Sequence, residues 1–109
     1  MELRHCALQA FQIRDPAEKV AAVQRVWATQ ADLPLDCGVQ LPWPDAPGRP
    51  SSPELVEPHA VARRSPFTAE GHAALIHPIA HIEFNAINLA LDAVWRFADL
   101  PESYYRDWM

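Results

Sequence analysis

The sequence predicts an all-α protein, and three observations support that fold class. Apolar residues return every three or four positions in two short segments near the N-terminus. The same period continues through one long segment of the second half, and a proline-rich stretch without any regular period separates the two parts. We therefore expect a helical hairpin over residues 1–33, a Pro-rich strap or linker over 34–67, and a long helix with the start of another over 68–109.

The two N-terminal helices are predicted from their apolar positions and from one start signal. The apolar stripe of the first helix consists of Leu3, Cys6, Ala7, Ala10 and Phe11. The second helix should begin at Asp15, because Asp15 suits the N-cap, Pro16 the first helical position and Glu18 the third. Its predicted buried stripe consists of Val20, Val23, Trp27 and Ala31. Two short helices with one apolar side each need cover from elsewhere in the chain.

The region from Pro34 to Pro66 is predicted to be extended, because it holds eight of the eleven prolines of the chain. A structureless loop of this length is uncommon inside a compact domain. It should therefore be a linker or a strap laid over a larger body. Trp43, Leu55 and Val56 are the expected anchors of such a strap, since a solvated linker has little use for a tryptophan.

The long helix should begin near Thr68 or Ala69 and run to about residue 98. Pro78 lies inside it and removes one backbone hydrogen bond, which predicts a kink over residues 74–78 or a start near residue 77. Asp99 and Glu102 flank Pro101 and are the expected caps of a last helix over residues 100–109. A helix that has just begun where the sequence stops indicates a truncated protein.

Composition narrows the classes of function. A formal charge of −5 and a pI near 5.4 argue against a nucleic-acid surface, and Arg63-Arg64 is the only basic pair. Cys6 and Cys37 lie far apart without zinc-ligand spacing, so reduced thiols are expected. No apolar run approaches the roughly 20 residues that span a bilayer, and Arg4, His5 and Gln9 interrupt the N-terminus where the apolar region of a signal peptide would lie. These features predict a soluble cytoplasmic protein.

Glu83 is the candidate functional residue, because it is the only ionisable group in an apolar helical stripe. At about 100° per residue, several apolar residues fall within roughly 60° of it: Ile76, Ile79, Ala80, Ala86, Ile87, Ala90, Val94 and Phe97. A carboxylate there should be buried with a partner. Two interpretations stay open: a core salt bridge or boundary position, and a metal ligand in a helix bundle. The opposite face, with His81, Asn85, Asn88, Asp92 and Arg96, is an ordinary polar surface.

A metal site made by this chain alone would be incomplete. His77 and His81 have i, i+4 spacing, but Glu83 lies about 120° and 160° from them around one regular helix. The two histidines are therefore expected at the surface. Ferritin-like di-metal bundles use one Glu from each of two helices and Glu-x-x-His from each of two others. This chain contains no Glu-x-x-His, so Glu83 supplies only one of six protein ligands.

The second half of the chain resembles a bacterial ferritin-like family catalogued as domain of unknown function 455. The resemblance is carried by HIEFNAINLALDAVWRF at residues 81–97 and LPESYYRDW at 100–108. Arg63-Arg64, GHAALIHPIAH at 71–81 and GRPSSPELV at 48–56 are also similar to it. The resemblance implies that Glu83 is the metal ligand of the first helix of a four-helix bundle. Members of that family are longer, and their next helix continues into a Glu-x-x-His motif that this chain does not reach.

The resemblance implies the N-terminal part of a di-metal carboxylate protein, with iron or manganese as the metal. Related di-iron bundles activate dioxygen, and one similar branch hydroxylates a modified tRNA base. A complete protein would then be an oxidoreductase, whereas this fragment alone is expected to be inactive. Two alternatives remain: a metal-free helical interaction module, in which Glu83 pairs with a basic residue, and a homo-oligomer that rebuilds a bundle from several copies. A partner is expected in each case, as a metal ion, a further copy or the missing C-terminal helices.

Overall fold

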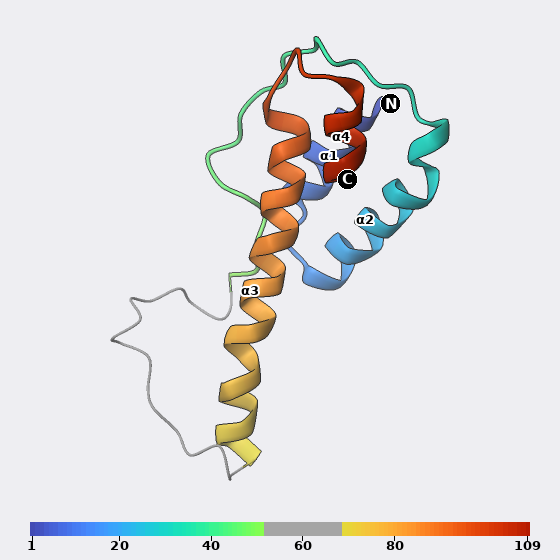
Figure 1. Cartoon of the computed structure of the whole chain (residues 1–109). Coiled ribbons are helices and arrows are strands. Elements are labelled where there is room, and N and C mark those ends of the chain that lie inside the picture. The colour runs from blue at the N-terminus through green and yellow to red at the C-terminus, as the bar shows by residue number, and fades with distance from the viewer. Residues whose placement is uncertain (52–68) are drawn as a thin grey trace.

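The computed structural model describes the backbone of residues 1–51 and 69–109, together with the side chains of residues 1–51 and 79–109. Within these ranges the chain is all-α. Its elements are α1 (Leu3–Gln12), α2 (Pro16–Thr29), a 3-10 turn η1 (Gln30–Asp32), α3 (Ala69–Arg96) and α4 (Glu102–Trp108). Figure 1 shows α1, α2 and α4 beside the C-terminal half of α3, while its N-terminal half extends beyond them.

The predicted start of the second helix is confirmed. The Asp15 carboxylate accepts a hydrogen bond from the backbone N–H of Glu18 at 2.9 Å, and Pro16 takes the first helical position. The cap of α1 was not predicted. Glu2 supplies it, because its carboxylate accepts from the backbone N–H groups of Arg4 and His5. Both caps satisfy helix N–H groups that lack intrahelical partners.

One hydrophobic core joins α1 to the end of α3. α1 contributes Leu3, Ala7, Leu8, Ala10 and Phe11, α3 contributes Leu91, Val94 and Trp95, and the remaining members are Ala22, Leu41 and Tyr105. Trp95 is fully buried, and its ring lies 5.3 Å from that of Phe11 between centroids. α1 thereby gives the long helix the cover that an isolated amphipathic helix lacks.

α3 is continuous from Ala69 through Pro78 to Arg96, so the alternative start near residue 77 is wrong. The caps predicted for the last helix are also wrong. Asp99 adopts a left-handed conformation with φ of 63°, which reverses the chain between α3 and α4, and its N–H donates to the carbonyl of Cys37 at 2.7 Å. Pro101 takes the N-cap position of α4 without a side-chain hydrogen bond.

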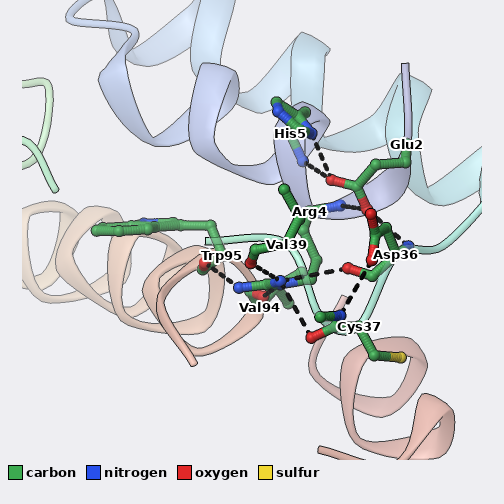
Figure 2. Close-up of polar contacts among 9 residues, drawn as sticks. Glu2, Arg4, His5, Asp36, Cys37, Val39, Val94 and Trp95 are labelled. Carbon is green, nitrogen blue, oxygen red and sulfur yellow. Dashed lines mark hydrogen bonds and ion pairs between the residues drawn. The ribbon is translucent and has the colours of Figure 1, made fainter. Parts of the chain in front are cut away.

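Arg4 is fully buried and binds five backbone carbonyls (Figure 2). Its Nε donates to Val94 O at 3.2 Å and its Nη2 to Trp95 O at 2.8 Å, two of the carbonyls that α3 leaves without partners at its C-terminus. Its Nη1 donates to three carbonyls of the strap, those of Asp36, Cys37 and Val39. The guanidinium therefore connects the strap to the C-terminal end of α3, where the helix dipole is negative. All five acceptors in this network are backbone carbonyls.

Lys19 is the second fully buried cation, and it connects four segments. Its Nζ donates to Phe11 O at 2.7 Å and to Asn88 Oδ1 at 2.5 Å. Asn88 Nδ2 donates to Gly48 O at 3.5 Å, and Gly48 N–H donates back to Phe11 O at 2.8 Å, which closes a ring of hydrogen bonds. The prediction of an ordinary polar surface is therefore wrong for Asn88, which is 4% exposed, because the strap and the hairpin cover that flank of α3.

The strap lies close to the helices over its described part. Gly48 meets α1 so tightly that a Cβ atom there would lie 2.3 Å from the carbonyl oxygen of Gln12. Trp43 is 63% exposed, but its ring centroid lies 4.4 Å from the guanidinium carbon of Arg96. Leu41, at 7% exposure, is the buried anchor that was not predicted. The other two expected anchors, residues 55 and 56, lie outside the described residues.

An apolar groove that carries Glu83

A shallow groove of about 300 Å³ lies between α2, α3 and α4. Its lining consists of Val23 from α2, Glu83, Ala86, Ile87, Ala90 and Leu91 from α3, and Trp108 and Met109 at the end of α4. Glu83 is the only ionisable side chain among these lining residues. The Glu83 carboxylate therefore lies on an otherwise apolar wall.

Glu83 is exposed, so the prediction that it is buried with a partner is wrong for this structure. Within the described side chains, no hydrogen bond or ion pair joins Glu83 to another residue. The reason is the direction of packing. α1 and the strap pack on the flank of α3 that contains Asn88, Leu91 and Trp95, whereas Glu83 lies roughly 80–140° away around the helix. The stripe that includes Glu83 was expected to face a core. In this structure Val94 does so, whereas Ala86, Ile87 and Ala90 line the groove beside Glu83, and Ile79 and Phe97 are exposed.

In α2, too, the face that is buried in the structure differs from the predicted one. Its predicted stripe is largely exposed, since Val20 is 39% and Trp27 64% accessible, and α2 buries Lys19 and Ala22 instead. The face of α2 that contains Lys19 packs toward α1 and α3, where Lys19 contacts Phe11 and Asn88. Val23 consequently faces the groove, and it is the residue of the α2 stripe that lines it. Two helices thus present unburied apolar surface beside Glu83.

The described residues do not complete a metal site. No group of three or more His, Cys, Asp or Glu side chains within residues 1–51 and 79–109 has the geometry to hold an ion. His81 is half-buried, and its Nε2 lies 3.1 Å from the Asn85 side-chain nitrogen instead of near the groove. The side chain of His77 lies outside the described residues. Glu83 is therefore the one candidate metal-ligand side chain at the groove among the described residues, and any further ligands would have to come from other segments.

Replacing Glu83 with glutamine should change the free energy of unfolding by less than about 0.5 kcal/mol, because an exposed side chain without a described partner contributes little. Urea melts of both proteins measure this change. Asp92→Asn on the same helix is the matched control, since its carboxylate accepts from Arg96 at 2.6 and 2.9 Å and should cost about 1 kcal/mol. A loss of several kcal/mol for Glu83→Gln would instead support the interpretation that Glu83 forms a core salt bridge.

Comparisons with known proteins identify a family for this chain but say little about its activity. A family model described as "Protein of unknown function (DUF455)" matches residues 12–109. An uncharacterized protein of Haemophilus influenzae is 52% identical over 67 residues, an alignment that covers 55% of this chain and 23% of that relative. No solved structure matches. No helix in the described part of the chain is both long and apolar enough to cross a membrane. The family match covers most of the sequence, and the chain therefore belongs to the DUF455 family.

Proposed function

We propose that this chain provides the first metal-binding helix of a ferritin-like di-metal carboxylate protein, with Glu83 as one ligand. The observation that supports the proposal best is the position of Glu83 as the only lining residue of an apolar groove that has an ionisable side chain. A carboxylate at such a position becomes costly to bury once further helices close the groove, unless a cation neutralises it. In helix bundles, carboxylates that point into the core commonly bind a metal ion.

The remaining ligands are proposed to come from helices that pack onto the groove. The exposed apolar walls on α2 and α3 offer them a surface, and carboxylate with imidazole ligands would suit iron or manganese. In the complete protein we propose a di-iron centre of the class that activates dioxygen, which makes that protein an oxidoreductase. The reaction is inferred from the class of site, because a fold does not fix a function. In this chain, α3 would position Glu83, and the apolar walls would limit access of water.

The 109-residue chain should retain well under one iron ion per chain after incubation with ferrous iron and dialysis, because its described residues place one carboxylate side chain at the groove and contain no cluster of three or more candidate ligands. Elemental analysis measures the iron content. The Haemophilus influenzae relative, of which the aligned segment is 23%, is the longer test protein and should retain about two metal ions per chain. A stoichiometric di-iron content in the monomer of this chain, or a metal-free relative, would contradict the proposal.

A metal-free interaction module is the second candidate, and the exposed apolar surface favours it. Every lining residue of the groove except Glu83 is apolar, and Trp108 at its edge is 51% exposed. The module would use the groove to hold a helix of another protein. The metal content of the longer relative separates the two candidates, because only the di-metal protein retains metal.

A further inference from the structure

We propose that α4 is a lid at the groove, anchored at Tyr105 and latched at Arg106. Trp108 and Met109 at the C-terminal end of α4 line the groove together with Glu83. The inference deepens the proposed function, on which the role of Glu83 rests, because the lid would control access to that carboxylate. The lid itself depends on the contacts of α4, so it can be tested without a metal.

α4 is too short to be stable without tertiary contacts. It comprises seven residues, Glu102–Trp108, and isolated helices shorter than about 12–15 residues are marginal in water. Its N-cap residue, Pro101, provides no side-chain hydrogen bond. The position of α4, and with it the position of Trp108 and Met109, therefore depends on the contacts that α4 makes with the rest of the chain.

Tyr105 anchors α4 on the α3 side. Its side chain is fully buried, and its hydroxyl donates to Phe97 O at 2.8 Å and accepts from the backbone N–H of Leu100 at 3.2 Å. Both partners lie in the segment that connects α3 to α4, and the Asp99 N–H in the same segment donates to Cys37 O at 2.7 Å. Figure 1 shows α4 folded back beside the C-terminal turns of α3. Movement of Tyr105 would break this buried network, so Tyr105 is the fixed point of α4.

Arg106 latches α4 to the α2 side. Its Nη2 donates to Leu33 O at 3.3 Å and its Nη1 to Gln30 O, and both carbonyls lie in the segment that follows α2. Arg106 also forms an ion pair with Glu102 at 3.4 Å. That pair lies within α4, and the Glu102 side chain is 67% exposed, so it contributes little to the position of the helix. The latch therefore consists of the two carbonyl contacts.

The lid can open at the latch while its anchor stays in place. Tyr105 is the one buried residue of α4, whereas Trp108 is 51% exposed. Segments with few buried apolar contacts open at low cost in free energy. Rotation of α4 about Tyr105 would move Trp108 and Met109 out of the groove. The open lid would uncover the groove wall at Ala90 and give an incoming helix room beside Glu83.

Thiol labelling at Ala90 measures the opening, in a background with Cys6→Ser and Cys37→Ser. The Ala90→Cys variant places a thiol in the half-buried wall of the groove, and a bulky aromatic disulfide reagent should reach it faster when α4 moves away. Arg106→Met should raise the labelling rate at least about fivefold, because opening no longer breaks two hydrogen bonds from a charged donor. Glu102→Gln is the matched control, since it removes the exposed ion pair and leaves the carbonyl contacts, and it should change the rate less than about twofold.

The same measurement on Ala10→Cys separates lid opening from general unfolding. Ala10 is 1% exposed in the core beneath α1, and its labelling rate should change less than about twofold when Arg106 is replaced. Arg106→Lys should give an intermediate rate at Ala90, because one ammonium group can still reach one carbonyl. This order of rates also decides the test if Arg106→Met loses helicity in circular dichroism.

Two results would overturn the lid. One is an unchanged labelling rate at Ala90 in the Arg106 variants, which would show that the carbonyl contacts do not hold α4 in place. The other is an equal increase at Ala90 and Ala10, which would show that replacing Arg106 destabilises the whole fold. The assay contains no metal, so a failure of the lid leaves the proposed metal site to be decided by the iron content.

Discussion

Replacing Arg4 with methionine should lower the free energy of unfolding by about 3–5 kcal/mol, the loss expected when a buried polar network loses its central donor. Methionine fills much of the volume of the arginine stem, so the loss reports the hydrogen bonds more than a cavity. Five backbone carbonyls would lose a charged donor, among them Val94 O and Trp95 O at the end of α3. Urea denaturation followed by circular dichroism measures the loss.

Arg25→Met is the matched control for Arg4. Arg25 is an exposed arginine on α2, and its replacement should change stability by less than about 0.5 kcal/mol. Arg4→Lys adds a second comparison, because one ammonium group cannot reach carbonyls of both α3 and the strap with a planar fork. We expect Arg4→Lys to be nearly as destabilising as Arg4→Met. A loss below 1 kcal/mol for Arg4→Met would show that the carbonyls find other donors or water.

The stability of the chain should rise by about 3 kcal/mol between pH 8 and pH 10.5, through the titration of Lys19. Burial lowers the pKa of Lys19 from 10.5 to about 8. Between these two values the unfolded chain holds the lysine proton and the folded chain does not, so folding releases a proton and raising the pH favours the folded state. Below pH 8 both states carry the proton, and the full cost of burying the charge remains.

Lys19→Met isolates this effect, because the variant should lack the rise that Lys19 causes. The comparison is needed because other groups titrate in the same window. Burial raises the pKa values of Cys6 and Tyr104, which makes stability fall as the pH increases through their range. Urea melts of both proteins at several pH values give the difference curve. A flat difference curve would show that the charged amine is as well solvated in the folded state as in the unfolded chain.

The hydrogen-bond ring explains why the amine is retained despite its cost. Phe11 O and Asn88 Oδ1 accept from Lys19 Nζ whether the amine is charged or neutral, and the rings of Phe11 and Phe84 lie 5.8 and 5.2 Å from it. These contacts come from α1 and α3, and Gly48 of the strap joins through Asn88. No carboxylate lies within hydrogen-bonding distance of this amine among the described residues. The charge is therefore offset by dipoles and ring faces alone.

Local signals in the sequence predicted the starts of α2 and α3 but not the caps of α1 and α4. Asp15 and Pro16 predicted the start of α2, and the apolar period predicted a long helix that begins near Ala69. These features depend on a few neighbouring residues. The all-α class was predicted for the same reason, since it follows from the helical periods.

The buried face of α1 was predicted correctly, since Leu3, Ala7, Ala10 and Phe11 are buried. Those of α2 and of most of α3 could not be predicted, because they depend on which segment packs against which. The period of α2 favoured Val20 and Trp27 for the core, but the structure buries Lys19, whose long aliphatic stem reaches Asn88. Periodicity assigns a lysine and an asparagine to solvent, so no local pattern indicates that the two meet. The groove around Glu83 depends in the same way on Trp108 at the far end of the chain. Its role as a metal ligand stays a prediction.

The contacts of Arg4 also determine when this protein can fold during its synthesis. Its partners Val94 and Trp95 lie 90 and 91 residues later in the chain, so these two hydrogen bonds cannot form until residues 94 and 95 have left the ribosome. At about 5–20 residues per second, α1 waits roughly 5–20 s outside the ribosome with its apolar side uncovered. Contacts of such long range also make folding slow compared with local helix pairs. The nascent chain should therefore depend on chaperones that hold α1 until the end of α3 emerges.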